Sequence, residues 1–348
     1  MAATDEGKAH ARLYANTPCF RAAPLSDRFG ADVYVKMEAA QPSGSFKLRG
    51  VSLACLRAAN QGYEVFVSSS GGNAGLAVAV AGQALKVPVI VYLPTSTPES
   101  VAGALRAYGA EVRVEGSMWS EANAAAMREV ERKNAEANRP AAKLMHPFDD
   151  AVMWEGHATL IAEAHESMAH LPPPCAVVCS VGGGGLLMGV LKGLESTPAW
   201  RGVPVVAVET VGADCLARSL AARSVVELDA ITSVAKSLGA NKTTEEIYDT
   251  CASAVDAGTL SSAVIDDAMA VEGAVAFLEA QRCVVEPACG AAVAAALPSG
   301  GAAFETARRL HERRGGPLLV VACGGAVATV PSLAAMARDL GVAFPTSL

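Results

Sequence analysis

The sequence predicts an α/β protein whose parallel sheets are covered by helices on both sides. Short runs rich in Val, Ile and Leu alternate along the chain with segments of helical pattern, as in parallel strands that are joined by helices. The runs are continuously apolar, which is typical of strands buried on both faces. Of the 348 residues, 51% are hydrophobic and 18% are charged, so the chain can build a large core.

The strands follow one another through most of the chain. We expect them at 33–37, 64–69, 87–94, 110–115, 175–181, 203–209 and 317–323. Four helical segments follow strands directly, at 74–86, 98–108, 120–137 and 185–194. A strand followed by a helix and then by another strand is the repeating unit of a parallel sheet.

Two proline-containing connections divide this series into groups. They are "ANRPAAKLMHPFDD" at 137–150 and "MAHLPPPC" at 168–175. We therefore predict a small α/β domain at 41–143 and a large α/β domain made of 1–40 plus 144–348.

Composition argues against several classes of partner. The net charge of −7 and the lack of any basic run disfavour nucleic acid. No apolar run approaches the roughly 18 residues of a membrane span, and the polar N-terminus does not resemble a secretory signal. The nine cysteines form no repeating framework, which is typical of reduced thiols inside a cell. We expect a cytoplasmic protein that binds neither nucleic acid nor membrane.

Three glycine-containing turns follow predicted strands and carry the functional signal. They are "SSSGGNAG" (68–75), "SVGGGGLLMG" (180–189) and "ACGGAV" (322–327). The turns after the carboxyl ends of parallel strands line one crevice of a sheet, where ligands bind. The three turns therefore predict one shared site for a small molecule.

The four glycines at 182–185 form the most informative of these turns. Bare backbone N–H groups can converge there, and the following helix adds a partial positive charge at its N-terminus. This arrangement predicts an anion site suited to phosphate. It matches neither the P-loop nor the dinucleotide motif. The alternative is a turn whose glycines serve only flexibility or close packing.

The serine-rich turn and a lysine complete the predicted site. Hydroxyl, amide and N–H groups at 68–73 suit a carboxylate, although Ser70 or Asn73 could also simply cap the next helix. In "QPSGSFKLRG" (41–50), Lys47 follows Phe46 directly after a Pro-Ser-Gly-Ser turn. A lysine near a phosphate site and a carboxylate site predicts a Schiff base with pyridoxal 5′-phosphate. A lysine that is only exposed in a turn is the alternative.

Several motifs together resemble a known family. They are "PSGSFKLRG", "SSSGGNAG", "PFDD", "WEGHATLIAE", "SVGGGGLL", "VEPACGAA" and "VVACGG", in that order. The set resembles the serine/threonine dehydratases of the fold-type-II (tryptophan synthase β-like) pyridoxal-phosphate enzymes. It is most similar to animal-type L-serine dehydratases (L-threonine deaminases) and serine dehydratase-like proteins, over residues 14–345. The resemblance implies a two-domain enzyme for small hydroxy amino acids, and we expect a homodimer.

The resemblance also implies a role for individual residues. Lys47 matches the Schiff-base lysine and catalytic base, Phe46 the aromatic residue on the cofactor ring, and Asn73 the partner of its phenolic oxygen. Cys323 matches the residue that faces the pyridine nitrogen. The phosphate loop corresponds to Gly182, Gly183, Gly184, Gly185 and Leu186.

Substrate and cation sites follow from the same resemblance. The substrate carboxylate is expected at Ser70, Gly71, Gly72 and Asn73. A monovalent cation, usually K⁺ in this family, is expected at Glu209, the backbone of Ala213 and Cys215. The thiol of Cys215 is a poor ligand for a hard cation.

The implied reaction converts L-serine to pyruvate and L-threonine to 2-oxobutyrate, with release of ammonia. Because 348 residues leave no room for a C-terminal regulatory domain like that of the biosynthetic threonine deaminases, we expect a catabolic enzyme. Serine racemases carry a serine where this chain has Gly71, so racemisation would lack its second acid/base. Three alternatives remain: a serine racemase, a β-replacement enzyme of the cysteine-synthase kind, and a non-enzymatic binding protein.

Overall fold

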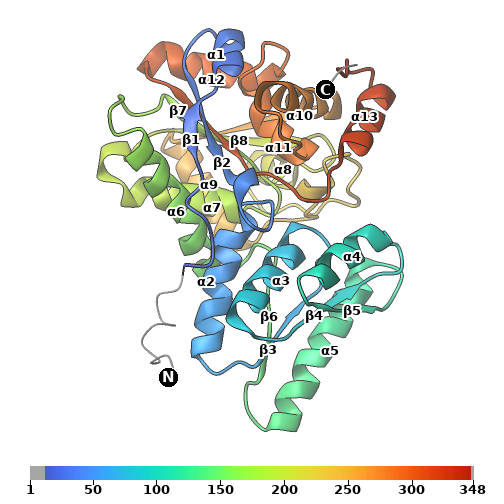
Figure 1. Cartoon of the computed structure of the whole chain (residues 1–348). Coiled ribbons are helices and arrows are strands. Elements are labelled where there is room, and N and C mark those ends of the chain that lie inside the picture. Colours follow the sequence, from blue (N-terminus) through green and yellow to red (C-terminus); the bar gives the residue numbers. More distant parts are fainter. Residues whose placement is uncertain (1–11, 346–348) are drawn as a thin grey trace. The chain divides into compact units, whose positions relative to one another are not determined.

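The computed structural model of the chain describes residues 12–345. These residues form two compact units, each with its own sheet (Figure 1). The first unit contains residues 12–15 and 41–156, and the second contains 16–40 and 157–345. Helix α6 spans the division after Gly156. The domain ranges expected from the sequence, 41–143 and 1–40 plus 144–348, stay a prediction.

The strands and helices alternate through both units. The strands are β1 (Cys19–Arg21), β2 (Val33–Met37), β3 (Val65–Ser68), β4 (Val89–Leu93), β5 (Glu111–Val114), β6 (Ala142–Leu144), β7 (Ala176–Ser180), β8 (Val205–Thr210), β9 (Leu260–Ile265) and β10 (Leu318–Ala322). The α-helices are α1 (Ala23–Phe29), α2 (Lys47–Asn60), α3 (Asn73–Leu85), α4 (Glu99–Ala107), α5 (Trp119–Ala137), α6 (Ala151–Ser167), α7 (Gly185–Ser196), α8 (Cys215–Ala222), α9 (Glu245–Asp256), α10 (Asp267–Gln281), α11 (Pro287–Ala294), α12 (Gly301–Arg314) and α13 (Val330–Asp339). Short 3₁₀ turns lie at Glu38–Ala40 (η2), Pro198–Trp200 (η3) and Lys236–Leu238 (η4).

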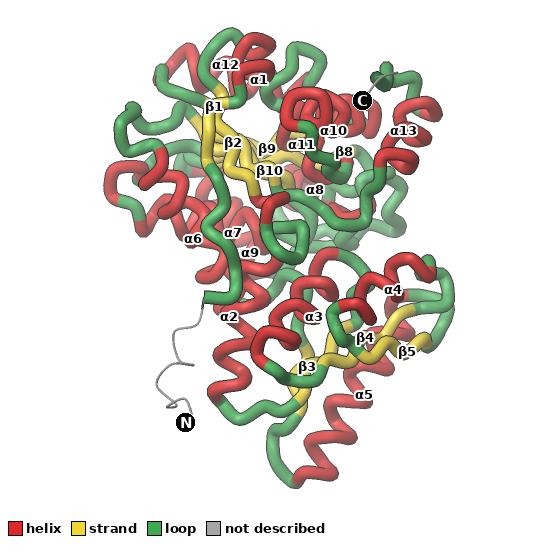
Figure 2. The backbone as a smooth tube through the Cα atoms, in the orientation of Figure 1, coloured by secondary structure: helices red, strands yellow, loops and turns green. Residues whose placement is uncertain are grey.

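The first unit contains a four-stranded parallel sheet in the order β5-β4-β3-β6. Alternate residues of its strands point to opposite faces. Phe66 and Val91 join a core with apolar residues of α2, α3 and α4, whereas Val67 and Ile90 join one with alanines of α5. Helices therefore cover both faces of this sheet, with α5 on one face and α2, α3 and α4 on the other (Figure 2).

The second unit contains a six-stranded sheet in the order β1-β2-β10-β7-β8-β9. All neighbouring pairs are parallel except β1 with β2, an antiparallel pair at one edge. Strands β7, β8 and β10 are buried along their whole length. Helices α11 and α12 pack on the sheet, and α10 packs on α11. The carboxyl ends of β10, β7 and β8 are therefore neighbours, and the loops that leave them emerge side by side.

The α/β class with flanked parallel sheets is confirmed. Each predicted strand occurs within two residues of its expected bounds. Three strands were not predicted: β1 and β6, with three residues each, are too short to show a pattern. Strand β9, "LSSAVI", lies at an edge and is only partly buried, so it lacks the continuous apolar run of its neighbours.

Candidate active site

Lys47 is the first residue of helix α2 in the first unit. Its Nζ atom donates a hydrogen bond to the carbonyl oxygen of Pro147, at 2.6 Å, and lies 5.1 Å from the centroid of the Phe46 ring. Pro147 follows strand β6, which pairs with β3. The amine is thus half-buried beside the carboxyl edge of the four-stranded sheet, and it is directed by a specific acceptor.

Two other lysines of this chain, Lys36 and Lys143, contact other groups. The Nζ atom of Lys36 is fully buried and donates to the Glu163 carboxylate at 2.7 Å and to the carbonyl of Thr17 at 2.6 Å. Lys143 places its Nζ atom 5.7 Å from the centroid of the Tyr63 ring. Of these three lysines, Lys47 is therefore the one whose amine is held by a backbone carbonyl in the segment that follows β6.

The serine-rich turn follows β3 at the same sheet edge. Ser70 Oγ accepts a hydrogen bond from the backbone N–H of Gly72, and Ser69 Oγ donates to the side chain of Asn123. The residue that caps helix α3 is Gly72, and it makes no side-chain cap bond. The expected alternative, a cap made by Ser70 or Asn73, is therefore wrong: Asn73 is already the first helical residue.

Gly71 lies against apolar side chains of its own unit. A Cβ atom built on it would stand 3.0 Å from Leu93 Cδ2 and 3.4 Å from both Thr97 Cγ2 and Val101 Cγ1. A contact of 3.0 Å is closer than side chains normally tolerate. Any side chain at this position must therefore displace its neighbours.

The tetraglycine turn connects β7 to α7 in the second unit. Within residues 12–345, the backbone N–H groups of Gly182–Gly185 donate to no other protein atom. Gly184 has φ +98°, and a Cβ atom there would stand 2.5 Å from Ile247. Backbone donors of this kind normally find a partner, so four unpaired amides at a helix N-terminus fit a bound phosphate.

Cys323 follows strand β10, the neighbour of β7. Its side chain is buried, and its Sγ atom lies 3.5 Å from the hydroxyl oxygen of Ser180, the last residue of β7. A hydrogen bond to Cys323 and burial raise the pKa of the Cys289 thiol well above its usual value. The thiol of Cys323 therefore stands in a compact group of neutral, weakly polar side chains beside the tetraglycine turn.

Glu209 lies at the end of β8 and is fully buried. Its carboxylate accepts hydrogen bonds from the N–H groups of Leu216 at 2.9 Å and Ala217 at 2.7 Å, in the first turn of α8. Burial raises the pKa of Glu209 to about 8, against the opposing effect of these two hydrogen bonds. The carboxylate thus has a structural role in capping α8, whether or not a cation binds.

The other two residues expected at the cation site, Ala213 and Cys215, follow Glu209 closely in the chain. The N–H of Ala213 donates to the carbonyl of Thr210, in the turn between β8 and α8. Cys215 Sγ lies 3.9 Å from the carbonyl oxygen of Gly182. This contact links the start of α8 to the tetraglycine turn.

The expected site residues thus fall into two groups. The first unit holds Phe46, Lys47, Ser70, Gly71, Gly72 and Asn73; the second holds Gly182–Leu186, Glu209, Ala213, Cys215 and Cys323. The sequence predicted that the three turns line the crevice of a single sheet. The turn at 68–75 belongs to the four-stranded sheet, whereas the other two belong to the six-stranded sheet, so that prediction is wrong.

Sequence reasoning missed three contributors to these groups. They are Pro147, which accepts the bond from Lys47, Ser180, which contacts Cys323, and Glu286, which contacts the turn after β10. The motif "VEPACGAA" contained Glu286, but its partners lie 49 and 41 residues away in the chain. No local pattern identifies such partners.

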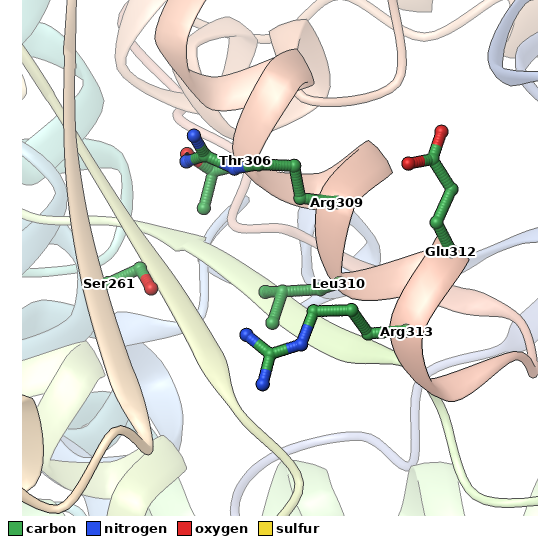
Figure 3. A pocket seen from close by; sticks show the side chains of 6 residues that line it. All are labelled: Ser261, Thr306, Arg309, Leu310, Glu312 and Arg313. Carbon is green, nitrogen blue, oxygen red and sulfur yellow. The ribbon is translucent and has the colours of Figure 1, made fainter.

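A separate surface pocket of about 320 Å³ lies where α12 faces the edge strand β9 (Figure 3). It is lined by Ser261, Thr306, Arg309, Leu310, Glu312 and Arg313. None of the expected site residues lines it. Among the described residues, no helix is both long and apolar enough to span a membrane.

These features define a class of protein. The family of pyridoxal-phosphate dependent enzymes matches residues 11–324, and the chain belongs to it. The resemblance to serine dehydratases is also confirmed. The L-serine dehydratase/L-threonine deaminase of Mus musculus is 38% identical over 334 residues, which cover 95% of this chain and 97% of that protein. The serine dehydratase-like protein of Rattus norvegicus is 41% identical and covers 89% of each chain.

Solved structures agree with this placement. A fungal L-serine ammonia-lyase from Rhizomucor miehei has a TM-score of 0.81 and 28% identity, over 94% of this chain and 99% of that one. Maize serine racemase has a TM-score of 0.79, over 96% of each chain, but only 23% identity, so it shares the fold alone. The fold is therefore that of fold-type-II pyridoxal-phosphate enzymes.

Proposed function

We propose that this chain is a pyridoxal-phosphate-dependent ammonia-lyase that converts L-serine to pyruvate and L-threonine to 2-oxobutyrate. One observation carries the proposal. In a chain 38% identical to an L-serine dehydratase/L-threonine deaminase over nearly its whole length, the Lys47 amine is half-buried and held by the Pro147 carbonyl.

The donor set of the chain fits the cofactor. Pyridoxal 5′-phosphate, when bound, supplies an aldehyde for covalent attachment and a ring that accepts electrons from the substrate. Lys47 would hold the aldehyde, and Phe46 and Asn73 would contact the ring. The unpaired amides of Gly182–Gly185, with Leu186, would hold the phosphate. Cys323 would stand beside the ring nitrogen.

Lys47 is the residue that we propose to move the α-proton of the substrate. An amine that is partly removed from water and oriented by a hydrogen-bond acceptor is suited to general base catalysis. The bond to Pro147 fixes the direction of the Nζ atom at the start of α2. Ser70, Gly71, Gly72 and Asn73 would bind the substrate carboxylate through the turn after β3.

Two features favour elimination over other outcomes. Cys323 has a thiol where a carboxylate would stabilise a positive charge on a neighbouring nitrogen, and without that charge the ring would accept electrons less strongly. Gly71 carries no acid or base, so a proton cannot be returned to the opposite face of the substrate from this position. Together they favour loss of the β-hydroxyl over racemisation.

A monovalent cation, K⁺ by preference, forms part of the proposal. The buried carboxylate of Glu209 and the backbone carbonyl of Ala213 would provide hard oxygen ligands. Cys215 would contribute little, because a thiol is a soft ligand. A homodimer in the cytoplasm also remains a proposal, which size-exclusion chromatography with light scattering and cell fractionation would test.

The experiment for the function measures product, cofactor and stereochemistry together. The purified chain is incubated with pyridoxal phosphate and L-serine or L-threonine, and 2-oxo acid, ammonia and D-serine are quantified. We expect equal amounts of oxo acid and ammonia, with little D-serine. D-serine forming as fast as pyruvate would show a racemase. Cofactor bound without any turnover would show a binding protein, and an added thiol or sulfide incorporated at the β-carbon would show a β-replacement enzyme.

A further inference from the structure

Glu286 is a buried carboxylate in the second unit that the mechanism above does not use. It is the residue before α11, and only 4% of its surface is exposed. Its side chain makes no cap bond to its own helix. Buried carboxylates normally need strong hydrogen-bond donors, so its partners reveal its role.

The donors come from two other segments. The hydroxyl of Ser237, in the η4 turn, donates a short hydrogen bond to Glu286 Oε2. The backbone N–H of Val327, in the turn after β10, donates to Glu286 Oε1 at 3.3 Å. One carboxylate therefore joins the start of α11, the η4 turn and the turn that begins at Cys323.

The turn after β10 is shaped to receive this carboxylate. Gly325 has φ +130°, a conformation that side chains rarely adopt. A Cβ atom on Gly325 would overlap the carboxyl group of Glu286. The glycine that follows Cys323 by two residues is thus required by the position of Glu286, and not only by the turn.

The η4 turn in its own right contacts the tetraglycine turn. A Cβ atom on Gly182 would lie 3.1 to 3.3 Å from the backbone atoms of Leu238, the residue after Ser237. The backbone of η4 therefore packs directly on the first glycine of the proposed phosphate loop. Contacts run from Glu286 through Ser237 and Leu238 to Gly182, and from Glu286 through Gly325 and Val327 to the Cys323 turn.

We propose that Glu286 is a positioning residue that holds the tetraglycine turn and the Cys323 turn in a binding-competent arrangement before the cofactor arrives. The proposal rests on the proposed function for what the two turns bind. Glu286 acts through Ser237, Leu238 and Val327, and it need not touch cofactor or substrate. Such support should appear in the affinity for pyridoxal phosphate and in the mobility of both turns, and much less in the chemical step.

The test uses the full chain and compares Glu286→Gln with wild type. Gln keeps the shape but has only one acceptor oxygen, whereas both carboxylate oxygens of Glu286 accept hydrogen bonds. In the cofactor-free protein, hydrogen exchange should become about tenfold faster in residues 182–185, 236–240 and 323–327. The dissociation constant of pyridoxal phosphate should rise about tenfold, whereas kcat at saturating cofactor should stay within about threefold.

Glu272→Gln is the matched control. Glu272, on α10, accepts a hydrogen bond from the Ser299 hydroxyl at 2.7 Å in an exposed position, so the same chemical change is made away from both turns. It should leave exchange in the three segments and cofactor affinity unchanged. Ser237→Ala removes one hydrogen-bond donor without altering Glu286. This variant replaces Glu286→Gln in both measurements if Glu286→Gln does not fold. Its effect on affinity should add only partly to that of Glu286→Gln, because both variants alter the pairing of residue 286 with residue 237.

The outcomes separate this proposal from the proposed function. Wild-type exchange rates in all three segments of both variants would overturn the positioning role, as would faster exchange spread equally over β1 and β2. A kcat that falls at saturating cofactor while affinity is unchanged would also contradict it. Failure of the wild type to bind pyridoxal phosphate would instead overturn the proposed function, and the exchange measurement would still decide the role of Glu286.

Discussion

The Nζ atom of Lys47 donates a hydrogen bond to the carbonyl oxygen of Pro147, which lies 100 residues further along the chain. This bond sets the direction of the amine at the start of α2, and the conformation of the 146–150 turn sets the position of the carbonyl. The imidazole of His146 organises that turn, because its Nδ1 atom accepts hydrogen bonds from the N–H groups of Phe148 and Asp149.

The first prediction is that Lys47 carries the cofactor. Borohydride reduction followed by peptide mapping should place the pyridoxyl group on Lys47, because Lys36 is buried against Glu163 and Lys143 lies over Tyr63. Lys47→Ala should keep the thermal stability of the fold but lose covalent attachment and nearly all turnover. Label on Lys36 or Lys143 would contradict the assignment. Lys143→Ala is the control. It should carry the pyridoxyl group on Lys47, as the wild type does.

The second prediction concerns the stability of the 146–150 turn at low pH. Burial lowers the pKa of His146 below its usual value near 6.5; the charge of Lys47 acts in the same direction, and Asp149 and Asp150 oppose it. Because the folded pKa is the lower one, the stabilisation is complete above about pH 6.5 and is lost as pH falls through the folded pKa. Protonation puts a hydrogen on Nδ1, which then cannot accept the two N–H groups.

The measurement for His146 is the melting temperature between pH 5 and pH 8. His146→Asn places an oxygen acceptor near the Nδ1 position that does not titrate in this range, so the loss of stability on acidification should become shallower. His170→Asn changes an exposed histidine and should leave the profile as in wild type. If His146→Asn and wild type lose stability in parallel, the turn does not depend on neutral His146.

The third prediction concerns Gly71 and stereochemistry. Wild type should form D-serine about 10² to 10⁴ times more slowly than pyruvate, the usual effect of a missing acid/base group. Gly71→Ser should raise the ratio of D-serine to pyruvate, and Gly71→Ala should not, because only the serine brings a hydroxyl. Both place a Cβ atom 3.0 Å from Leu93 Cδ2, so their melting temperatures should be similar to each other. Chiral chromatography and thermal melts check the two effects, and equal ratios in both variants would count against the acid/base argument.

The fourth prediction concerns K⁺ and Glu209. Burial raises the pKa of Glu209 to about 8, so without a bound cation the native protein keeps a proton there that the unfolded chain has lost. Stability should therefore fall as pH rises from about 5 to 8. A cation beside the carboxylate favours its ionised form, so the gain in melting temperature from K⁺ over tetramethylammonium should be larger at pH 8 than at pH 6.

Variants test whether the K⁺ effect arises at Glu209. Glu209→Gln should abolish the difference between K⁺ and tetramethylammonium, in melting temperature and in turnover. It should also lower stability without K⁺, because Gln presents an N–H group to one of the two α8 amides that Glu209 now binds. Glu195→Gln changes an exposed glutamate and should retain the full K⁺ effect. Equal rates of wild type in the two salts would remove the cation from the mechanism.

Much of the fold could be predicted from local pattern. Strands β7, β8 and β10 are buried on both faces, so each appears in the sequence as an unbroken apolar run with a glycine or acidic turn after it. Strand β9 was not predicted, because an edge strand keeps one side partly exposed and its "LSSAVI" does not stand out. The candidate residues Lys47 and Gly182–Gly185 were found because their neighbours in sequence are unusual.

By itself, the sequence determined the α/β class, the family, and which lysine and which glycine turn to consider, because these depend on residues adjacent in the chain. The tertiary structure decided what orients them. The partners in these contacts are 41 to 143 residues apart in the chain: Lys47 with Pro147, Cys323 with Ser180, and Glu286 with Ser237 and Val327. A hydrogen bond depends on distance and direction in space, and chain segments this far apart meet only when the sheets and helices have packed.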